Sequence, residues 1–164
     1  MSHHPGADAT TESVDSRLRR LEIVLPPAPV AIANYLPFAI SKNLLYLSGQ
    51  GPGAPDGSFH LGKVGDTVSV EDAYLHARLA GIRLLSVAQL ALGSLDRVQR
   101  IVKLLGLVNS AANFKDHPKV INGCSDLMVE VFGESGRHAR SAIGVNSLPR
   151  NMTVEIEAII EIRA

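Results

Sequence analysis

The stretch Val154-Glu-Ile-Glu-Ala-Ile-Ile-Glu-Ile162 alternates between apolar and mostly acidic residues. Side chains on a β-strand point alternately to opposite faces of the sheet. The two faces of this segment therefore differ in chemistry. One face carries Val154, Ile156, Ala158, Ile160 and Ile162, and the other carries Glu155, Glu157, Ile159 and Glu161. The pattern predicts a strand that covers a core with its first face.

Two segments upstream have the periodicity of long helices. Residues 70–92 contain no proline, follow a capping box formed by Ser69 and Asp72, and precede Gly93 as a C-terminal cap. Small and apolar residues are expected on the buried face of this helix: Ala73, Ala77, Ala80, Leu84, Val87 and Ala88, widened by Leu75, Leu79, Ile82, Leu85 and Leu90. A second helix is expected from about Pro118 to Gly133, with one apolar stripe: Val120, Cys124, Leu127, Met128 and Val131.

Three further segments complete the expected sheet: residues 43–50, 98–108 and 140–148. A short helix is expected over residues 16–23, and residues 58–64 are expected to form a short strand or an extended arm. The sequence thus predicts an α+β, two-layer domain, with two helices on one face of a four-to-six-stranded mixed sheet. Leu45, Leu47, Val145 and Ile159 are expected on the uncovered face, where a second copy of the chain would shield them from water.

Composition narrows the class of protein. The 164 residues suit one domain over residues 14–164, preceded by a small, polar tail over residues 1–13 that is expected to be disordered. Sixteen basic and sixteen acidic residues cancel, which argues against a dedicated nucleic-acid binder. No apolar run approaches the ~20 residues of a membrane helix, so no membrane partner is expected. The single cysteine and the absence of a secretory signal favour the cytoplasm.

Metal and cofactor sites are not predicted. His60, His76, His117 and His138 lack metal-ligand spacing, and no cysteine accompanies them. Residues 49–53 are glycine-rich, but no helix starts directly after them to hold a phosphate.

The C-terminal third resembles a known family. Arg140-Ser, Leu148-Pro149 and Val154-Glu-Ile-Glu-Ala158 follow one another as in the C-terminal signature of the YjgF/RidA family, also called endoribonuclease L-PSP or reactive intermediate deaminases. Tyr35 within Ala-Asn-Tyr-Leu-Pro-Phe and the run Leu45-Tyr-Leu-Ser-Gly-Gln-Gly-Pro52 match in the same order, so the resemblance covers residues 16–164. The chain looks closer to a less characterised branch with longer loops.

The resemblance implies a chorismate-mutase-like fold assembled as a homotrimer, with clefts between neighbouring subunits. It implies cofactor-independent hydrolysis of reactive enamines or imines of amino acids to 2-keto acids and ammonia. Arg140 matches the arginine that binds the substrate carboxylate, Glu155 the catalytic glutamate, and Tyr35 a cleft tyrosine normally supplied by the adjacent subunit. From the residues alone, pairing with an acid at a subunit interface is favoured for Arg140, and a structural role is favoured for Tyr35; the resemblance reverses the preference for Arg140. Periodicity does not choose among Glu155, Glu157 and Glu161.

Three further positions are candidates for substrate binding. Asn122 matches a family asparagine, although one extra residue separates it from Arg140, and a helix-surface asparagine is the alternative. Ala142 stands where family members often have cysteine, which argues against a covalent thiol mechanism. The backbone of Ala142 and Ile143 can still bind substrate, and Cys124 is expected to be a core residue.

Three functions are compatible with these residues. The first is an imine or enamine deaminase acting on a small carboxylate-bearing substrate. The second is a trimeric protein that binds a small carboxylate or keto acid without turnover, and both require Arg140. The third, ranked lowest, is an endoribonuclease or translation inhibitor, for which the charge balance gives no support.

Overall fold

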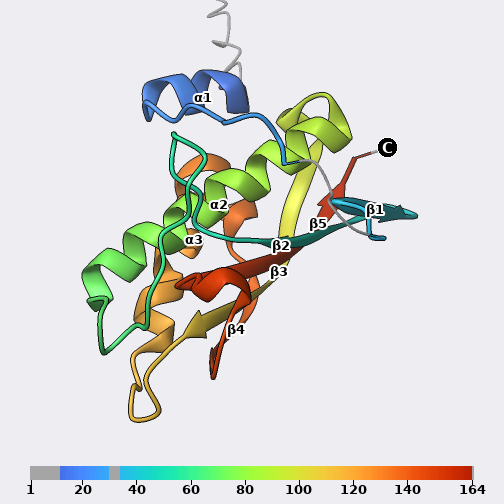
Figure 1. Cartoon of the computed structure of the whole chain (residues 1–164). Helices are drawn as coiled ribbons and strands as arrows, with labels where there is room; N and C mark the ends of the chain where they lie inside the picture. The colour runs from blue at the N-terminus through green and yellow to red at the C-terminus, as the bar shows by residue number, and fades with distance from the viewer. Residues whose placement is uncertain (1–11, 30–33, 164) are drawn as a thin grey trace, which may run out of the picture.

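The computed structural model describes residues 12–29 and 34–163, and shows a five-stranded sheet with two long helices on one face (Figure 1). The α-helices are α1 (Val14–Arg20), α2 (Val70–Leu92) and α3 (His117–Phe132). The strands are β1 (Phe38–Ser41), β2 (Leu44–Gln50), β3 (Val98–Asn109), β4 (Ala139–Val145) and β5 (Val154–Ile162). Their order is β1-β2-β5-β3-β4, with only β3 and β4 parallel. The predicted α+β class with a mixed sheet is confirmed.

β5 lies in the middle of the sheet, between β2 and β3. The five apolar side chains predicted to share one face are all buried against the helices. Between them, Glu155, Ile159 and Glu161 are half-buried and Glu157 is exposed. The predicted alternation is therefore confirmed, and it places Glu155 on the face of the sheet opposite the helices.

α2 begins and ends where the sequence predicts. The Ser69 hydroxyl accepts a hydrogen bond from the Asp72 amide at 3.0 Å, and Gly93 follows with φ of 75°. The small-residue face is buried, but Leu75 and Leu90 are 56% and 59% exposed, so the expected widening of that face is wrong at these two positions. They lie on the flank of the helix, beyond the stripe that contacts the core.

Small residues bring α2 close to α3 as well as to the sheet. A side chain at Gly81 would collide with Leu127 and Cys124 of α3, and one at Gly123 would collide with the Tyr74 carbonyl of α2. The apolar stripe predicted on α3 is fully buried. The two helices therefore form one closely packed layer over the sheet.

α2 is also long and apolar enough to cross a membrane, by length and composition only. This corrects the expectation that no segment has these properties. Half of its most apolar window is buried inside the protein, and core helices of globular domains share that property.

The structure differs from the sequence prediction in several short elements. β1 was not predicted, because it is a four-residue strand formed by a tight turn at Lys42, whose φ is 55°. β4 ends at Val145 instead of residue 148, residues 58–64 make isolated bridges only, and α1 begins two residues earlier than expected. The tail predicted to be disordered lies outside the described residues except Glu12 and Ser13, and Ser13 caps α1.

The uncovered face of the sheet carries only part of the predicted set: Ile159 lies there, and Val145 shares the strand face of Ile143. Leu45 and Leu47 are buried on the helix side, because Leu45 pairs with Ile160 and Leu47 with Ala158. The open face instead presents apolar side chains from four strands: Tyr46, Leu105, Leu107, Ile143 and Ile159. An apolar open face is present, but a prediction made without strand register assigned two leucines to the wrong side.

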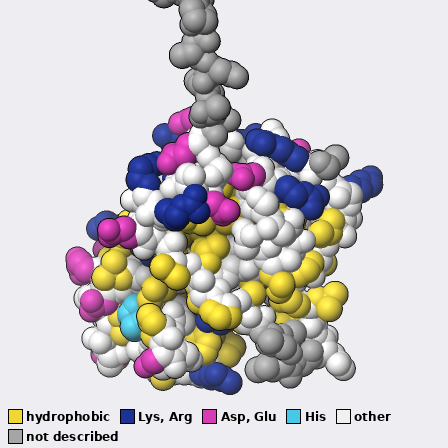
Figure 2. All heavy atoms as spheres, turned by 90° about the horizontal axis from the view of Figure 1, so that it is seen from above, with side chains coloured by type: hydrophobic (Ala, Val, Ile, Leu, Met, Phe, Trp, Pro, Cys, Tyr) yellow, Lys and Arg dark blue, Asp and Glu magenta, His cyan; other side chains and the backbone are white. Residues whose placement is uncertain are grey.

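Charges are mixed on the molecular surface seen from above. Figure 2 shows basic and acidic side chains interspersed, most of them in the upper half of the view, and apolar side chains mostly in the lower half. This distribution accompanies a formal net charge of zero.

Candidate functional site

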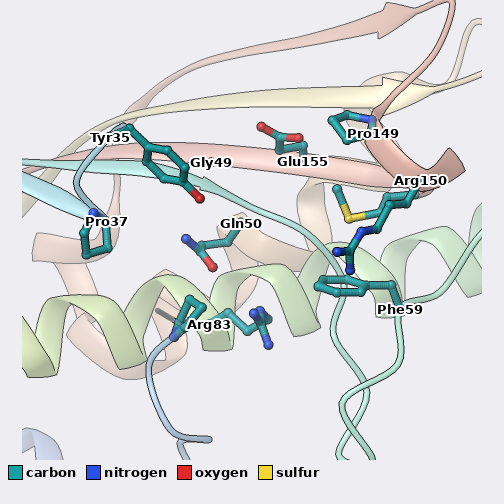
Figure 3. A pocket seen from close by; sticks show the side chains of 11 residues that line it. Tyr35, Pro37, Gly49, Gln50, Phe59, Arg83, Pro149, Arg150 and Glu155 are labelled. Carbon is teal, nitrogen blue, oxygen red and sulfur yellow. The ribbon is translucent and has the colours of Figure 1, made fainter. Parts of the chain in front are cut away.

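A cavity of about 390 Å³ opens where β2, β5 and the loop before β5 approach α2 (Figure 3). The pairing of β2 with β5 is interrupted between Leu47 and Gln50, beside this cavity. The lining residues come from both layers and from three loops: Pro29, Tyr35, Pro37, Gly49, Gln50, Phe59, Arg83, Pro149, Arg150, Met152 and Glu155. Such a break in register bends a strand and changes the direction of its side chains. Side chains of the open face can therefore reach the cavity at this end of the sheet.

Of the described residues that line the cavity, Glu155 alone is acidic. Its carboxylate lies against Gly49, and any side chain at Gly49 would collide with it. Burial raises the pKa of Glu155 above its usual range, and the negative charge of Glu157 raises it further. A carboxylate with a raised pKa is a better proton acceptor than an ordinary glutamate.

The other two glutamates of β5 have different surroundings. Glu157 is exposed, and Glu161 accepts a hydrogen bond from the Asn43 side-chain amide at 3.0 Å. Neither lines the cavity. The structure thus separates three residues that periodicity leaves equivalent.

Tyr35 borders the same cavity in the same chain. Its ring points toward Gly49 and Gln50 in Figure 3, and 52% of the residue is exposed. Gln50 is buried and donates its side-chain amide to the Ser48 carbonyl at 3.3 Å. One chain therefore brings Tyr35 and Glu155 together.

Arg140 lies on the opposite side of the sheet from Glu155. Arg140 is in register with Leu104, a buried residue of the helix-covered face. β3 lies between β4 and β5, so the strands that carry Arg140 and Glu155 do not pair. Within one chain the two residues do not meet, because both strand order and alternation separate them.

Side chains of α3 hold the Arg140 guanidinium. Its Nη1 donates to Asn122 Oδ1 at 2.8 Å and to Ser125 Oγ at 3.0 Å. Asn122 is therefore beside Arg140 despite the extra residue between them in the sequence. The fork of the guanidinium keeps further donors for a ligand.

His138 completes this arrangement around Arg140. Its Nδ1 lies 2.6 Å from the Gly136 carbonyl, which can only accept, so Nδ1 carries the hydrogen. Nε2 then accepts from the Ser125 hydroxyl at 2.9 Å, which leaves the Ser125 oxygen free to accept from Arg140. Burial lowers the pKa of His138, although the Gly136 bond opposes this, and the neutral ring is favoured.

Ala142 and Ile143 lie on the same edge strand as Arg140. β4 pairs with β3 on one side, and no other strand of the described chain pairs with it. Ile143 is exposed, whereas Ala142 packs against the core. Cys124 is fully buried as predicted, and burial raises the pKa of its thiol to about 12, which leaves it unreactive.

Histidines outside this region form a separate pair. His60 stacks on His76 with ring centroids 4.2 Å apart, and His76 Nδ1 lies 3.2 Å from the Thr153 hydroxyl. Burial, followed by the neighbouring His60, lowers the pKa of His76 to about 4. Among residues 12–29 and 34–163, no three His, Cys, Asp or Glu side chains gather to hold a metal ion.

Among the lining residues that sequence reasoning missed, three form one group: Phe59, Arg83 and Arg150. The Arg83 and Arg150 guanidinium carbons lie 5.3 and 5.8 Å from the centroid of the Phe59 ring. One signal was available, because Arg83 is the only charged residue from Leu79 to Leu95. A lone charge inside an apolar helical segment indicates a specific partner or site.

Comparisons with known proteins agree with this fold. The model of the YjgF/chorismate mutase-like endoribonuclease family matches residues 15–161. The chain belongs to the YjgF/RidA family. Small-molecule binding and oligomerisation are typical of this family.

Similar proteins cover nearly the whole length of the chain. Protein TCP17 of Trypanosoma cruzi is 42% identical over 150 residues, which are 91% of this chain and 94% of that protein. The structure of protein Atu1372 from Agrobacterium tumefaciens is 45% identical, covers 92% of both chains and superposes with a TM-score of 0.85. A Shewanella oneidensis MR-1 protein that carries an endoribonuclease name is 32% identical, with 92% and 100% coverage and a TM-score of 0.89.

Proposed function

We propose that this YjgF/RidA protein hydrolyses reactive 2-imino acids, or the enamines that tautomerise to them, to 2-keto acids and ammonia. The observation that supports the proposal most strongly is Glu155, a half-buried carboxylate with a raised pKa that shares a cavity with Tyr35. Its position in the sequence also matches the catalytic glutamate implied by the family resemblance.

In the proposed reaction, Glu155 accepts a proton from a water molecule as the water oxygen attacks the imine carbon. The C=N double bond becomes a single bond, and a tetrahedral carbinolamine forms. Starting from the protonated imine, this attack gives a neutral carbinolamine, whose nitrogen then takes the proton back from Glu155. The C–N bond breaks as Glu155 removes the proton of the carbinolamine hydroxyl, so that the carbonyl forms, ammonia leaves, and the proton passes from Glu155 to solvent. One water is consumed, and no oxidation or reduction occurs, so Glu155 acts first as general base and then as general acid.

Arg140 has a separate role in this proposal. Its guanidinium would bind the substrate carboxylate bidentately, while Asn122 and Ser125 hold it from the other side. Because Arg140 and Glu155 do not meet in one chain, the proposed cleft lies between subunits. One subunit supplies Arg140, Asn122 and the β4 backbone, and its neighbour supplies Glu155 and Tyr35.

The apolar open face supports assembly, and we propose the homotrimer that the family resemblance implies. Tyr46, at 40% exposure, and Ile143, at 48%, present apolar surface that a second subunit would cover. Neutral overall charge adds little repulsion between copies.

A coupled assay tests the proposed activity. An amino-acid oxidase generates the imine in the presence of semicarbazide, and formation of the semicarbazone is followed with and without the protein. We expect micromolar protein to divert the imine to the keto acid and to slow semicarbazone formation. No effect across imines of several side chains would contradict the deaminase, and binding of 2-ketobutyrate in that case would identify a binding protein.

A further inference from the structure

Two arginines converge on Phe59 at the side of the cavity away from Glu155 (Figure 3). Arg83 reaches it from α2 and Arg150 from the loop before β5, and both guanidinium groups lie within 6 Å of the Phe59 ring. Contact with an aromatic face stabilises a cation only modestly, by about 0.5–1 kcal/mol at exposed sites. Two cations beside one ring also repel each other.

No acidic side chain balances this pair. Within the described part of the chain, neither Arg83 nor Arg150 forms a salt bridge, and the Arg83 Nε is buried without a hydrogen-bond partner. Two other arginines that contact these helices do have polar partners. Arg78 of α2 forms a salt bridge with Glu130, and Arg140 donates a hydrogen bond to Asn122 of α3. Glu155, an acidic side chain of the same cavity, forms no ion pair with either arginine in the described part of the chain, so both positive charges are available to a bound anion.

A close contact restricts the Arg83 guanidinium. Its side chain lies against Gly53, where any side chain would collide with the guanidinium. Burial also lowers the pKa of Arg83, which indicates that its charge has lost part of its hydration. A guanidinium that is held in place and partly dehydrated binds an anion with little further ordering.

We propose that Arg83 and Arg150 form a second anion subsite, which binds a carboxylate at the end of the substrate side chain. This inference rests on the proposed function, because it names the substrate class of the same site: imino and keto acids with four or five carbons and two carboxylates. Amino-acid side chains that carry a negative charge end in carboxylates, and the arginine fork matches that group. Phe59 provides an apolar wall for the methylene groups between the two ends.

Calorimetric titration with two stable keto acids tests the subsite. 2-Oxoglutarate carries the second carboxylate, and 2-ketobutyrate lacks it. We expect the wild type to bind 2-oxoglutarate ~10-fold or more tightly than 2-ketobutyrate. Arg83→Gln and, separately, Arg150→Gln should reduce this ratio toward one. Arg78→Gln, also on α2 but paired with Glu130 on the surface, serves as the matched control and should keep the wild-type ratio.

The outcomes separate this inference from the proposed function. If the wild type binds both keto acids equally, or if the ratio survives both substitutions, the subsite is wrong and the deaminase remains. If Arg83→Gln weakens both ligands by the same factor, Arg83 binds the carboxylate next to the keto group, which also contradicts the subsite. If neither keto acid binds to the wild type, the subsite is wrong, and the coupled assay alone decides the deaminase. If circular dichroism shows that the Arg83→Gln variant unfolds at a lower temperature than the wild type, the binding ratio of the Arg150→Gln variant, whose substitution lies in an exposed loop, decides the test.

Discussion

The surroundings of Arg140 and those of Glu155 illustrate two ways of preparing a polar group for function. Arg140 has hydrogen-bond partners on α3, and His138 fixes the orientation of one of them. Glu155 has neither a salt bridge nor a hydrogen bond from a described side chain, and burial raises its pKa. The first arrangement suits a group that must keep one orientation, and the second suits a group that must exchange a proton.

The comparison also shows that these two halves face opposite sides of one sheet. Arg140 and Glu155 are only fifteen positions apart in the family signature, but strand order and alternation place them on opposite faces. If both halves serve one reaction, two copies of the chain must supply them. Single substitutions can therefore disturb each half separately.

The largest effect is expected from Glu155→Gln. Glutamine keeps the size of the side chain but cannot accept the proton of water, so we expect kcat to fall by ~10²–10⁴-fold while the affinity for keto acids changes little. Steady-state deaminase assays measure the loss. Glu157→Gln on the same strand face is the control and should retain nearly full kcat at neutral pH, and an equal loss in both variants would refute the assignment.

Glu157→Gln also tests the cause of the raised pKa of Glu155. Removing its negative charge should lower the pKa of Glu155, because that charge is the second cause of the shift after burial. The acid limb of the kcat/KM profile should therefore move to lower pH. A profile that stays in place would show that a different group titrates.

Arg140 variants should affect binding more than chemistry. Arg140→Ala removes the bidentate partner of the carboxylate, and we expect KM and the Kd for 2-ketobutyrate to rise by ~10–100-fold. Arg140→Lys should recover little, because an ammonium cannot form the planar fork. Wild-type affinity in Arg140→Lys would mean that another residue holds the carboxylate.

A smaller effect is expected from the groups that orient Arg140. Ser125→Ala removes the link between His138 and Arg140, and KM should rise several-fold with kcat nearly unchanged. In the wild type, protonated His138 can no longer accept from Ser125, and burial lowers the pKa of His138. KM should therefore stay flat through neutral pH and rise only below about 6.5. If KM of the Ser125→Ala variant rises at low pH as in the wild type, the hydrogen bonds through Ser125 are not the cause of that rise.

The smallest effect concerns stability at the stacked pair of His60 and His76. The pKa of His76 is about 4 in the folded chain and ordinary when unfolded, so the unfolded state binds more protons between about 6.5 and 4. His76 should thus favour unfolding as pH falls through this range and contribute nothing to pH dependence above it. Urea denaturation at several pH values should show a weaker acid loss in His76→Gln than in the wild type, and identical slopes would contradict the assignment.

The sequence was sufficient for local structure and for the residues within the motif. The β5 alternation, the Ser69 cap and the α3 stripe depend on near neighbours, and all three are confirmed. Strand order was not predictable, because the insertion of β3 between β4 and β5 is a pairing of distant segments. For the same reason Leu45 and Leu47 were assigned to the wrong face, and the contact of Phe59 with Arg83 and Arg150 was missed.

Complementation between two inactive variants tests the central claim most directly. Glu155→Gln and Arg140→Ala chains are denatured together, refolded as mixed oligomers and assayed, with chain exchange verified by native mass spectrometry. If each cleft takes Arg140 from one subunit and Glu155 from its neighbour, about one cleft in four regains both residues in an equal mixture. We therefore predict recovery of roughly a quarter of wild-type activity. Exchanged oligomers that remain as inactive as the separate variants would contradict the shared cleft.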